Sequence, residues 1–140
     1  MNKLIITINL VLALLSCSSK HDNKQKAEIL VNNSKANMKF LNEFHNFGKI
    51  EAGEQISFSF KFQNTGTGVL KIDSVISDCG CIVVSFPEEN ILPNESNYID
   101  VLFNSRGEMG RVLRQIEIFA NNGQNTSLSI TADVNNPIFN

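Results

Sequence analysis

Hydrophobic and polar residues alternate without interruption over residues 56–63, which read ISFSFKFQ. Strict alternation puts the polar residues on one face of a strand and, on the other, Ile56, Phe58, Phe60 and Phe62. Turn-forming residues follow at 64–68 (NTGTG), and a second apolar stretch follows at 69–72 (VLKI). The pattern predicts an antiparallel hairpin with one apolar face, which needs a second layer to cover its phenylalanines.

The same alternation predicts strands along the rest of the chain. A first strand is expected over residues 40–50, and a slip in the alternation after residue 72 indicates a bulge or a change of sheet. Later strands are expected at residues 81–86, 98–104, 116–120 and 128–134, with a hairpin turn at 121–123. About seven short strands and no helix in the domain predict an all-β fold, an immunoglobulin-like antiparallel β-sandwich.

The N-terminus has the pattern of an export signal. A short positive start precedes an apolar run at residues 4–15, which is too short to span a bilayer and typical of a signal peptide over residues 1–16. The run ends in Leu14-Leu15-Ser16-Cys17, which resembles the bacterial lipobox, where cleavage occurs before a lipidated cysteine. The alternative is a plain secretory signal with an incidental cysteine at position 17.

The predicted anchor implies a simple domain organisation. Residues 17–37 are polar and rich in lysine, and we expect them to be the lipidated Cys17 and a flexible linker. The sandwich is expected at residues 38–135, with a short tail at 136–140. Several acyl chains anchor a protein firmly without a transmembrane helix. We therefore expect a lipid-anchored protein of the cell envelope, at the periplasmic or surface face of the outer membrane.

Composition and charge exclude several classes of function. The formal net charge is −2 and no basic cluster occurs, so a nucleic-acid partner is not expected. The sequence has no nucleophile elbow, zinc-protease helix motif or phosphate-binding glycine loop. His45 is the single histidine of the expected domain. We expect neither an enzyme nor a small-molecule substrate.

Several short motifs together resemble one bacterial family, the domain of unknown function 1573. They are FGKI with Gly53-Glu54, FQNTG followed by LKI, Cys79-Gly80-Cys81, LPNE, VLF, and Gly107 with Gly110-Arg111, in this order across residues 40–134. The resemblance implies an immunoglobulin-like lipoprotein module related to hydin-type domains, located in the envelope and without an assigned activity. The chain departs from the family pattern at Asp78, at Ile82 and at Asn94, which replaces a usual glycine but tolerates a left-handed turn.

Cys79-Gly80-Cys81 is the one motif that could carry chemistry. Residues two apart on an extended strand have Cα atoms roughly 6.6 Å apart, near the upper limit for a disulfide, although Gly80 could allow a turn. Three interpretations remain open: cysteines packed as small hydrophobic residues, a disulfide, or a thiol-redox or Cu(I) site. Possible further ligands, none of them close in sequence, are Met38, Met109 and His45. No other cofactor is expected.

Two further sites follow from short patterns. Asp73-Ser74-Val75 resembles an acceptor for O-glycans, which makes Ser74 a candidate modification site. The apolar strand after Cys81 suggests a surface for a protein partner at Ile82, Val84 and Phe86. The leading hypothesis is a binding or scaffolding module that contacts an envelope protein. The alternative is a lipoprotein that handles copper or exchanges thiols through Cys79 and Cys81.

Overall fold

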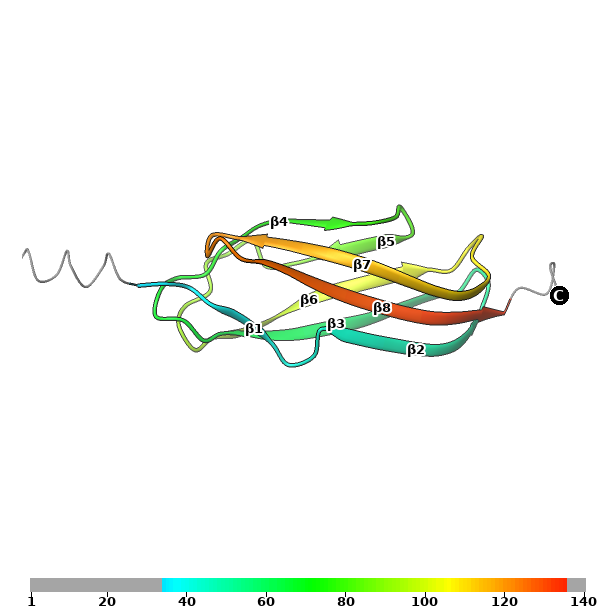
Figure 1. Cartoon of the computed structure of the whole chain (residues 1–140), viewed down its shortest axis with the longest axis horizontal. Coiled ribbons are helices and arrows are strands. Elements are labelled where there is room, and N and C mark those ends of the chain that lie inside the picture. Colours follow the sequence, from blue (N-terminus) through cyan, green and yellow to red (C-terminus); the bar gives the residue numbers. More distant parts are fainter. Residues whose placement is uncertain (1–33, 136–140) are drawn as a thin grey trace, which may run out of the picture. The chain divides into compact units, whose positions relative to one another are not determined.

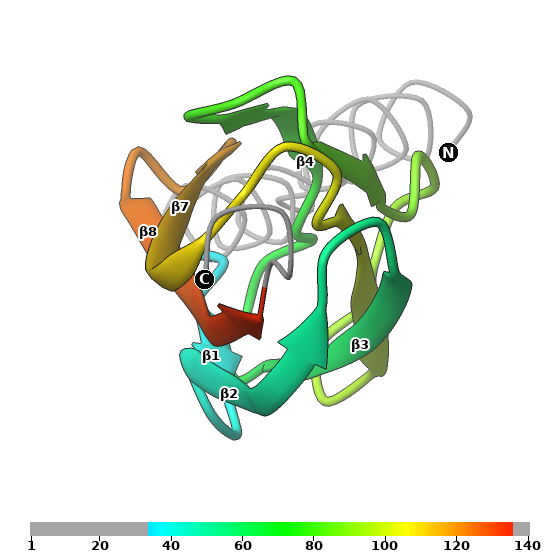
Figure 2. The same ribbon diagram turned by 90° about the vertical axis from the view of Figure 1, so that its right-hand side faces the viewer.

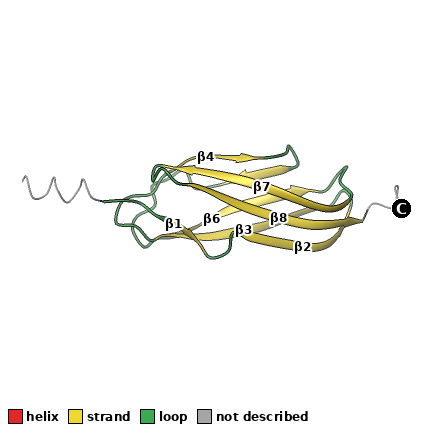
Figure 3. Cartoon of the chain, in the orientation of Figure 1, coloured by secondary structure: helices red, strands yellow, loops and turns green. Residues whose placement is uncertain are grey.

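The computed structural model describes residues 34–135. The predictions for the signal peptide, Cys17, most of the linker and the tail at 136–140 lie outside the described residues. Within residues 34–135 every regular element is a strand, which confirms the all-β prediction (Figure 3). This range contains no helix with the length and apolar character needed to cross a bilayer. The strands are β1 (Met38–Phe40), β2 (Phe44–Glu51), β3 (Gln55–Asn64), β4 (Ile72–Ser77), β5 (Ile82–Ser85), β6 (Ser96–Asn104), β7 (Gly110–Ala120) and β8 (Asn125–Asn135).

The strands form two four-stranded sheets that pack face to face (Figures 1 and 2). One sheet has the order β1-β3-β6-β5 and the other the order β2-β8-β7-β4. All pairs are antiparallel except β2 with β8, which run parallel. The predicted sandwich is therefore confirmed, with eight strands rather than seven and one mixed sheet.

Alternating residues of both sheets fill the space between the layers. Phe60 and Phe62 are each 1% exposed, while Lys61 between them faces solvent. The apolar faces predicted for β3, β6, β7 and β8 all turn inward, as period-two alternation requires. The largest fully buried side chains outside β3 are Leu70, Ile99, Val101, Phe103, Ile116, Ile118, Leu128 and Ile130.

The single first strand predicted over residues 40–50 is wrong, because this segment changes sheet. β1 pairs with β3, whereas β2 pairs with β8 in the opposite layer. Between them the chain turns away from the core at Leu41, whose side chain is 75% exposed. The polar residues at 42–43 provide the break in alternation at which a strand can leave its sheet.

The predicted phenylalanine hairpin is also wrong. β3 pairs with β1 and β6, and residues 69–72 pass to the other sheet, where β4 pairs with β7. The amides of Thr67 and Gly68 donate to the carbonyl of Lys35, so the intervening turn is bound to the incoming chain and not closed on itself. The predicted slip after Ile72 is confirmed as a register shift between Ile72 and Ser74.

Different loops lie at the two ends of the sandwich. The described chain enters the sandwich at the left-hand end in Figure 1, where the side chain of buried Asn64 bonds to three loops. Asn94 at this end adopts the left-handed conformation expected of it, with φ of 68°. The right-hand end carries the β4–β5 turn and the β6–β7 loop. The ten residues of β3 between the ends span about 33 Å.

Candidate functional site

The Cys79-Gly80-Cys81 motif forms the turn between β4 and β5. Cys79 and Cys81 are joined by a disulfide with a Cα–Cα distance of 5.2 Å, shorter than an extended strand would give. The turn accounts for the shorter distance, because β4 ends at Ser77 and β5 begins at Ile82. Both cysteines are partly exposed, and both pack against the edge of the core.

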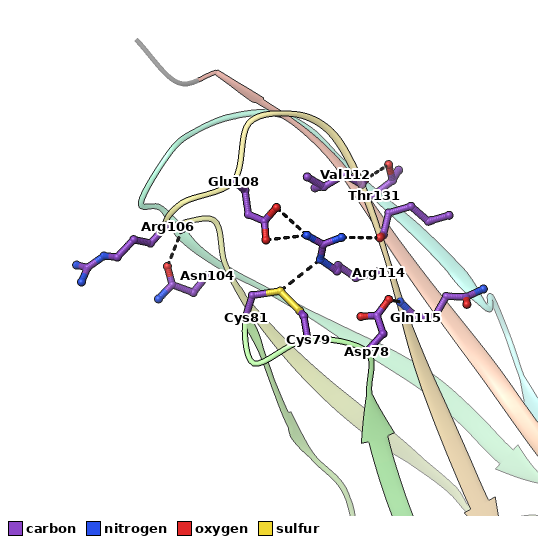
Figure 4. Close-up of polar contacts among 11 residues, drawn as sticks. Asp78, Cys79, Cys81, Asn104, Arg106, Glu108, Val112, Arg114, Gln115 and Thr131 are labelled. Atoms are coloured by element: carbon purple, nitrogen blue, oxygen red, sulfur yellow. Dashed lines mark hydrogen bonds and ion pairs between the residues drawn. A yellow bond between two sulfur atoms is a disulfide. The ribbon is translucent and has the colours of Figure 1, made fainter. Parts of the chain in front are cut away.

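Arg114 approaches this disulfide from β7, the strand that pairs with β4. Alternation along β7 turns Val112, Arg114 and Ile116 toward the space between the layers. Arg114 lies near the end of this row, where the guanidinium reaches the disulfide and not the apolar interior. Its Nε donates to the sulfur of Cys81 at 3.4 Å, and Nη1 donates to the carbonyl of Leu113 at 3.1 Å (Figure 4).

Glu108 fixes the position of Arg114. Nη2 of Arg114 lies 2.7 Å from both carboxylate oxygens of Glu108, and the two side chains are 24% and 20% exposed. Glu108 belongs to the β6–β7 loop, which is anchored by Ser105. The buried hydroxyl of Ser105 donates to the carbonyls of Glu51 and Glu54 in the β2–β3 turn. The carboxylate of Glu108 and the carbonyl of Leu113 therefore hold the Arg114 guanidinium against the sulfur of Cys81.

The disulfide closes a very short loop, so its expected contribution to stability is small. In the loop-entropy description, a disulfide around three residues contributes about 1.6 kcal/mol, roughly half of the value for a 15-residue loop. A nearby guanidinium stabilises a thiolate and increases its fraction at neutral pH. Within residues 34–135, no group of three or more His, Cys, Asp or Glu side chains is placed to hold a metal ion.

The predicted partner surface lies on β5, at the free edge of its sheet. Ile82 is 6% exposed and points into the core, and Val84 and Phe86 are half-buried against it. The outward side chain is Val83, which is 64% exposed and lies directly opposite Leu102 of β6.

The remaining candidates lie apart from the disulfide. Ser74 is exposed on the edge strand β4, at its register shift, and its glycosylation stays a prediction. His45 of β2 stacks on Phe58 with ring centroids 3.6 Å apart and meets the edge of Phe47. Burial lowers the pKa of the His45 imidazole below its ordinary value of 6.5. This histidine therefore behaves as an aromatic member of the inter-sheet packing.

Sequence reasoning missed both Arg114 and Glu108. A signal for Arg114 was present, because it occupies an inward position in the alternation Val112-Leu113-Arg114-Gln115-Ile116. A long charged residue in an apolar row must reach solvent or a partner at the end of the layer. Glu108 offered no comparable signal, since only the folded loop brings it to Arg114.

Several solved structures share this fold, a PapD-like domain among them. A protein of unknown function from Porphyromonas gingivalis W83 is 18% identical with a TM-score of 0.62, over 71% of this chain and 47% of that chain. The PapD-like domain 7 of human CEP192 is 11% identical with a TM-score of 0.60, over 71% and 85%. The YadV chaperone is 12% identical with a TM-score of 0.53, over 70% and 52%. At these identities the likeness is one of fold.

A comparison with protein-family models agrees with the resemblance inferred from the motifs. No curated protein matches the sequence. This chain spans about half of the Porphyromonas gingivalis protein, so the likeness concerns one domain. The family model for a protein of unknown function, DUF1573, matches residues 38–134, from the start of β1 almost to the end of β8. Because this match covers more than half of the sequence, the chain belongs to the DUF1573 family.

Proposed function

We propose that this protein is a lipid-anchored binding module of the cell envelope, which holds a partner protein and catalyses no reaction. The observation that carries the proposal is the exposed Val83 on the edge strand β5, which forms an apolar pair with Leu102 on the neighbouring strand β6. Solvated sheet edges are usually protected by charges, prolines or bulges. The outward residues of β5 are instead Val83 and Ser85, which suit an added strand with an apolar side chain.

The fold supports the same proposal. Solved structures of similar fold include a PapD-like domain and the YadV chaperone. Within residues 34–135 the one histidine is packed against aromatic rings, which leaves no imidazole base beside a nucleophile. The occupant we propose is an extended segment of an envelope protein, paired with β5 and covering Val83.

The lipobox-like sequence ending in Cys17 supports the anchoring part of the proposal. The described chain enters the sandwich at the end opposite the β4–β5 turn, where the backbone of Ser34 lies beside Gly68 (Figure 1). Replacement of Cys17 by serine should release the protein from the membrane fraction.

Site-specific photo-crosslinking in the bacterial envelope tests the proposed contact. A photoreactive amino acid at position 83 should yield a discrete crosslinked product of the full-length protein. The matched control is position 113, because Leu113 is 55% exposed on the outer face of the opposite sheet. A Leu102→Glu substitution should weaken the product from position 83. Equal products from positions 83 and 113, or none from either, would refute the assignment of this surface.

A further inference from the structure

We propose that the Cys79–Cys81 disulfide is a thiol-exchange site with a fixed polarity, attacked at Cys79 and leaving from Cys81. The inference goes beyond the binding function proposed above and does not depend on it. Its ligand class is thiols, either small molecules or protein dithiols. It rests on the position of Arg114, which contacts the sulfur of Cys81 and not that of Cys79.

The disulfide is open to an incoming thiolate. Cys79, Gly80 and Cys81 lie in the β4–β5 turn, where a disulfide joins the two cysteines (Figure 4). Both cysteines are partly exposed. Gly80 has no neighbouring atom within 4 Å of the place where a Cβ would stand, so nothing covers the turn at this point. An attacking sulfur can therefore approach the disulfide from the solvent side.

The polarity follows from the charge beside one sulfur. In thiol–disulfide exchange the better leaving thiol, whose thiolate is more stable, departs faster. The Arg114 guanidinium donates through Nε to Cys81, so negative charge that develops on this sulfur is stabilised where it forms. Attack at Cys79 is therefore favoured, because it places the leaving charge on Cys81.

The reaction balances as an ordinary exchange. A thiolate of the incoming reductant forms a bond to the Cys79 sulfur, the Cys79–Cys81 bond breaks, and its electron pair passes to Cys81. A second thiolate of the same reductant then attacks the mixed disulfide and releases Cys79. The reductant becomes a disulfide, the two cysteines gain two electrons, and protons from the reductant thiols are taken up by Cys79 and by solvent.

Glu108 makes the proposal testable, because its charge is opposite to that of Arg114. If the ion pair of Arg114 with Glu108 only stabilises the structure of the turn, loss of either side chain should change the exchange rate to the same extent. If Arg114 acts through its charge, Arg114→Leu should slow exchange, whereas Glu108→Gln should leave it as fast or faster. Arg114→Lys keeps the charge and should retain most of the rate.

The experiment uses the full-length protein in detergent. Reduction by dithiothreitol is followed by thiol release, and the mixed disulfide formed with glutathione is acid-quenched and located by mass spectrometry. We expect the glutathione adduct mainly on Cys79, and reduction of Arg114→Leu roughly three- to ten-fold slower than wild type. Circular dichroism checks that each variant is folded, and Arg114→Lys with Glu108→Gln provide the comparison if Arg114→Leu is not.

The outcomes separate clearly. Adducts divided equally between the cysteines, or equal reduction rates for wild type and Arg114→Leu, would overturn the proposal. So would a Glu108→Gln variant that slows as much as Arg114→Leu. A parallel reaction with a reduced thioredoxin-type protein assigns the source: faster exchange than with glutathione indicates a protein dithiol, and slower exchange indicates a small thiol.

Discussion

Asn64 offers the sharpest test of how the fold is held together. Its side chain is fully buried at the end where the chain enters the sandwich. The side-chain oxygen accepts from the amides of Asn37 and Gly66 at 3.2 and 3.0 Å, and the side-chain nitrogen donates to the carbonyls of Gly68 and Ile91 at 2.8 and 3.0 Å. One amide group thus joins the entry segment, the β3–β4 connection and the segment before β6.

The expected cost of Asn64→Ala follows from these four contacts. Each hydrogen bond contributes a net 0.5–1.5 kcal/mol or so, and a buried group left without a partner costs about 1–3 kcal/mol. Water can reach the two partly buried amides and recover some of the loss. We therefore expect the free energy of unfolding to fall by about 3 kcal/mol, with the backbone bonds of Asn64 retained.

Urea unfolding of the wild type and the variant measures this difference directly. The exposed Asn90 provides the control, and Asn90→Ala should change the free energy of unfolding by no more than about 0.5 kcal/mol. Asn64→Asp keeps the size of the side chain but directs an oxygen at two carbonyls, so it should destabilise at least as much as alanine at neutral pH. A loss below about 1 kcal/mol for Asn64→Ala would refute the reasoning.

Three further predictions follow from the packing. Gly66→Ala should destabilise strongly, because a Cβ there meets the backbone of residues 35–37, whereas Gly80→Ala should be neutral; thermal unfolding of both decides. Reduction of the disulfide should lower the free energy of unfolding by only about 1.6 kcal/mol in urea titrations with and without a phosphine reductant, and a loss above 4 kcal/mol would make the bond structural. Because burial lowers the pKa of His45, the unfolded chain binds a proton at this imidazole more tightly than the folded chain does. The contribution of neutral His45 to the free energy of unfolding is therefore complete above pH 6.5 and is lost as the pH falls through the folded pKa. His45→Phe should flatten this part of the stability–pH curve.

The sequence was most informative about faces and least informative about pairing. Alternation identified Phe60 and Phe62 as core residues because side-chain direction along a strand is a local property. It failed between Phe40 and Phe44, where two strands of different sheets are separated by only three residues. It failed again after Asn64, whose turn-like neighbours suggested a hairpin although the loop is bound to the entry segment. Pairing is decided by contacts distant in sequence, which alternation does not encode.

The candidate site shows the same limit. The spacing of Cys79 and Cys81 drew attention to the turn, but spacing alone left packing, disulfide and metal binding open. The asymmetry that distinguishes the two sulfurs comes from Arg114, which is 33 positions further along the chain than Cys81. A charged residue at an inward position of a strand indicates that it has a partner, but the sequence does not show which residue the fold brings to it.

The parallel pairing of β2 with β8 has a consequence for how the protein reaches its folded state. β8 is the central partner of both β2 and β7, and Phe44 pairs with Ser129. The sheet β2-β8-β7-β4 therefore cannot form from the N-terminal strands alone, because β2 has no partner until β8 is available. Contacts this distant slow folding. A chain that emerges N-terminus first during synthesis would keep β2 and the inner face of β3 uncovered until almost the whole domain is available. Proteins that bind unfolded chains should therefore matter more for this domain than for a sheet built from successive hairpins.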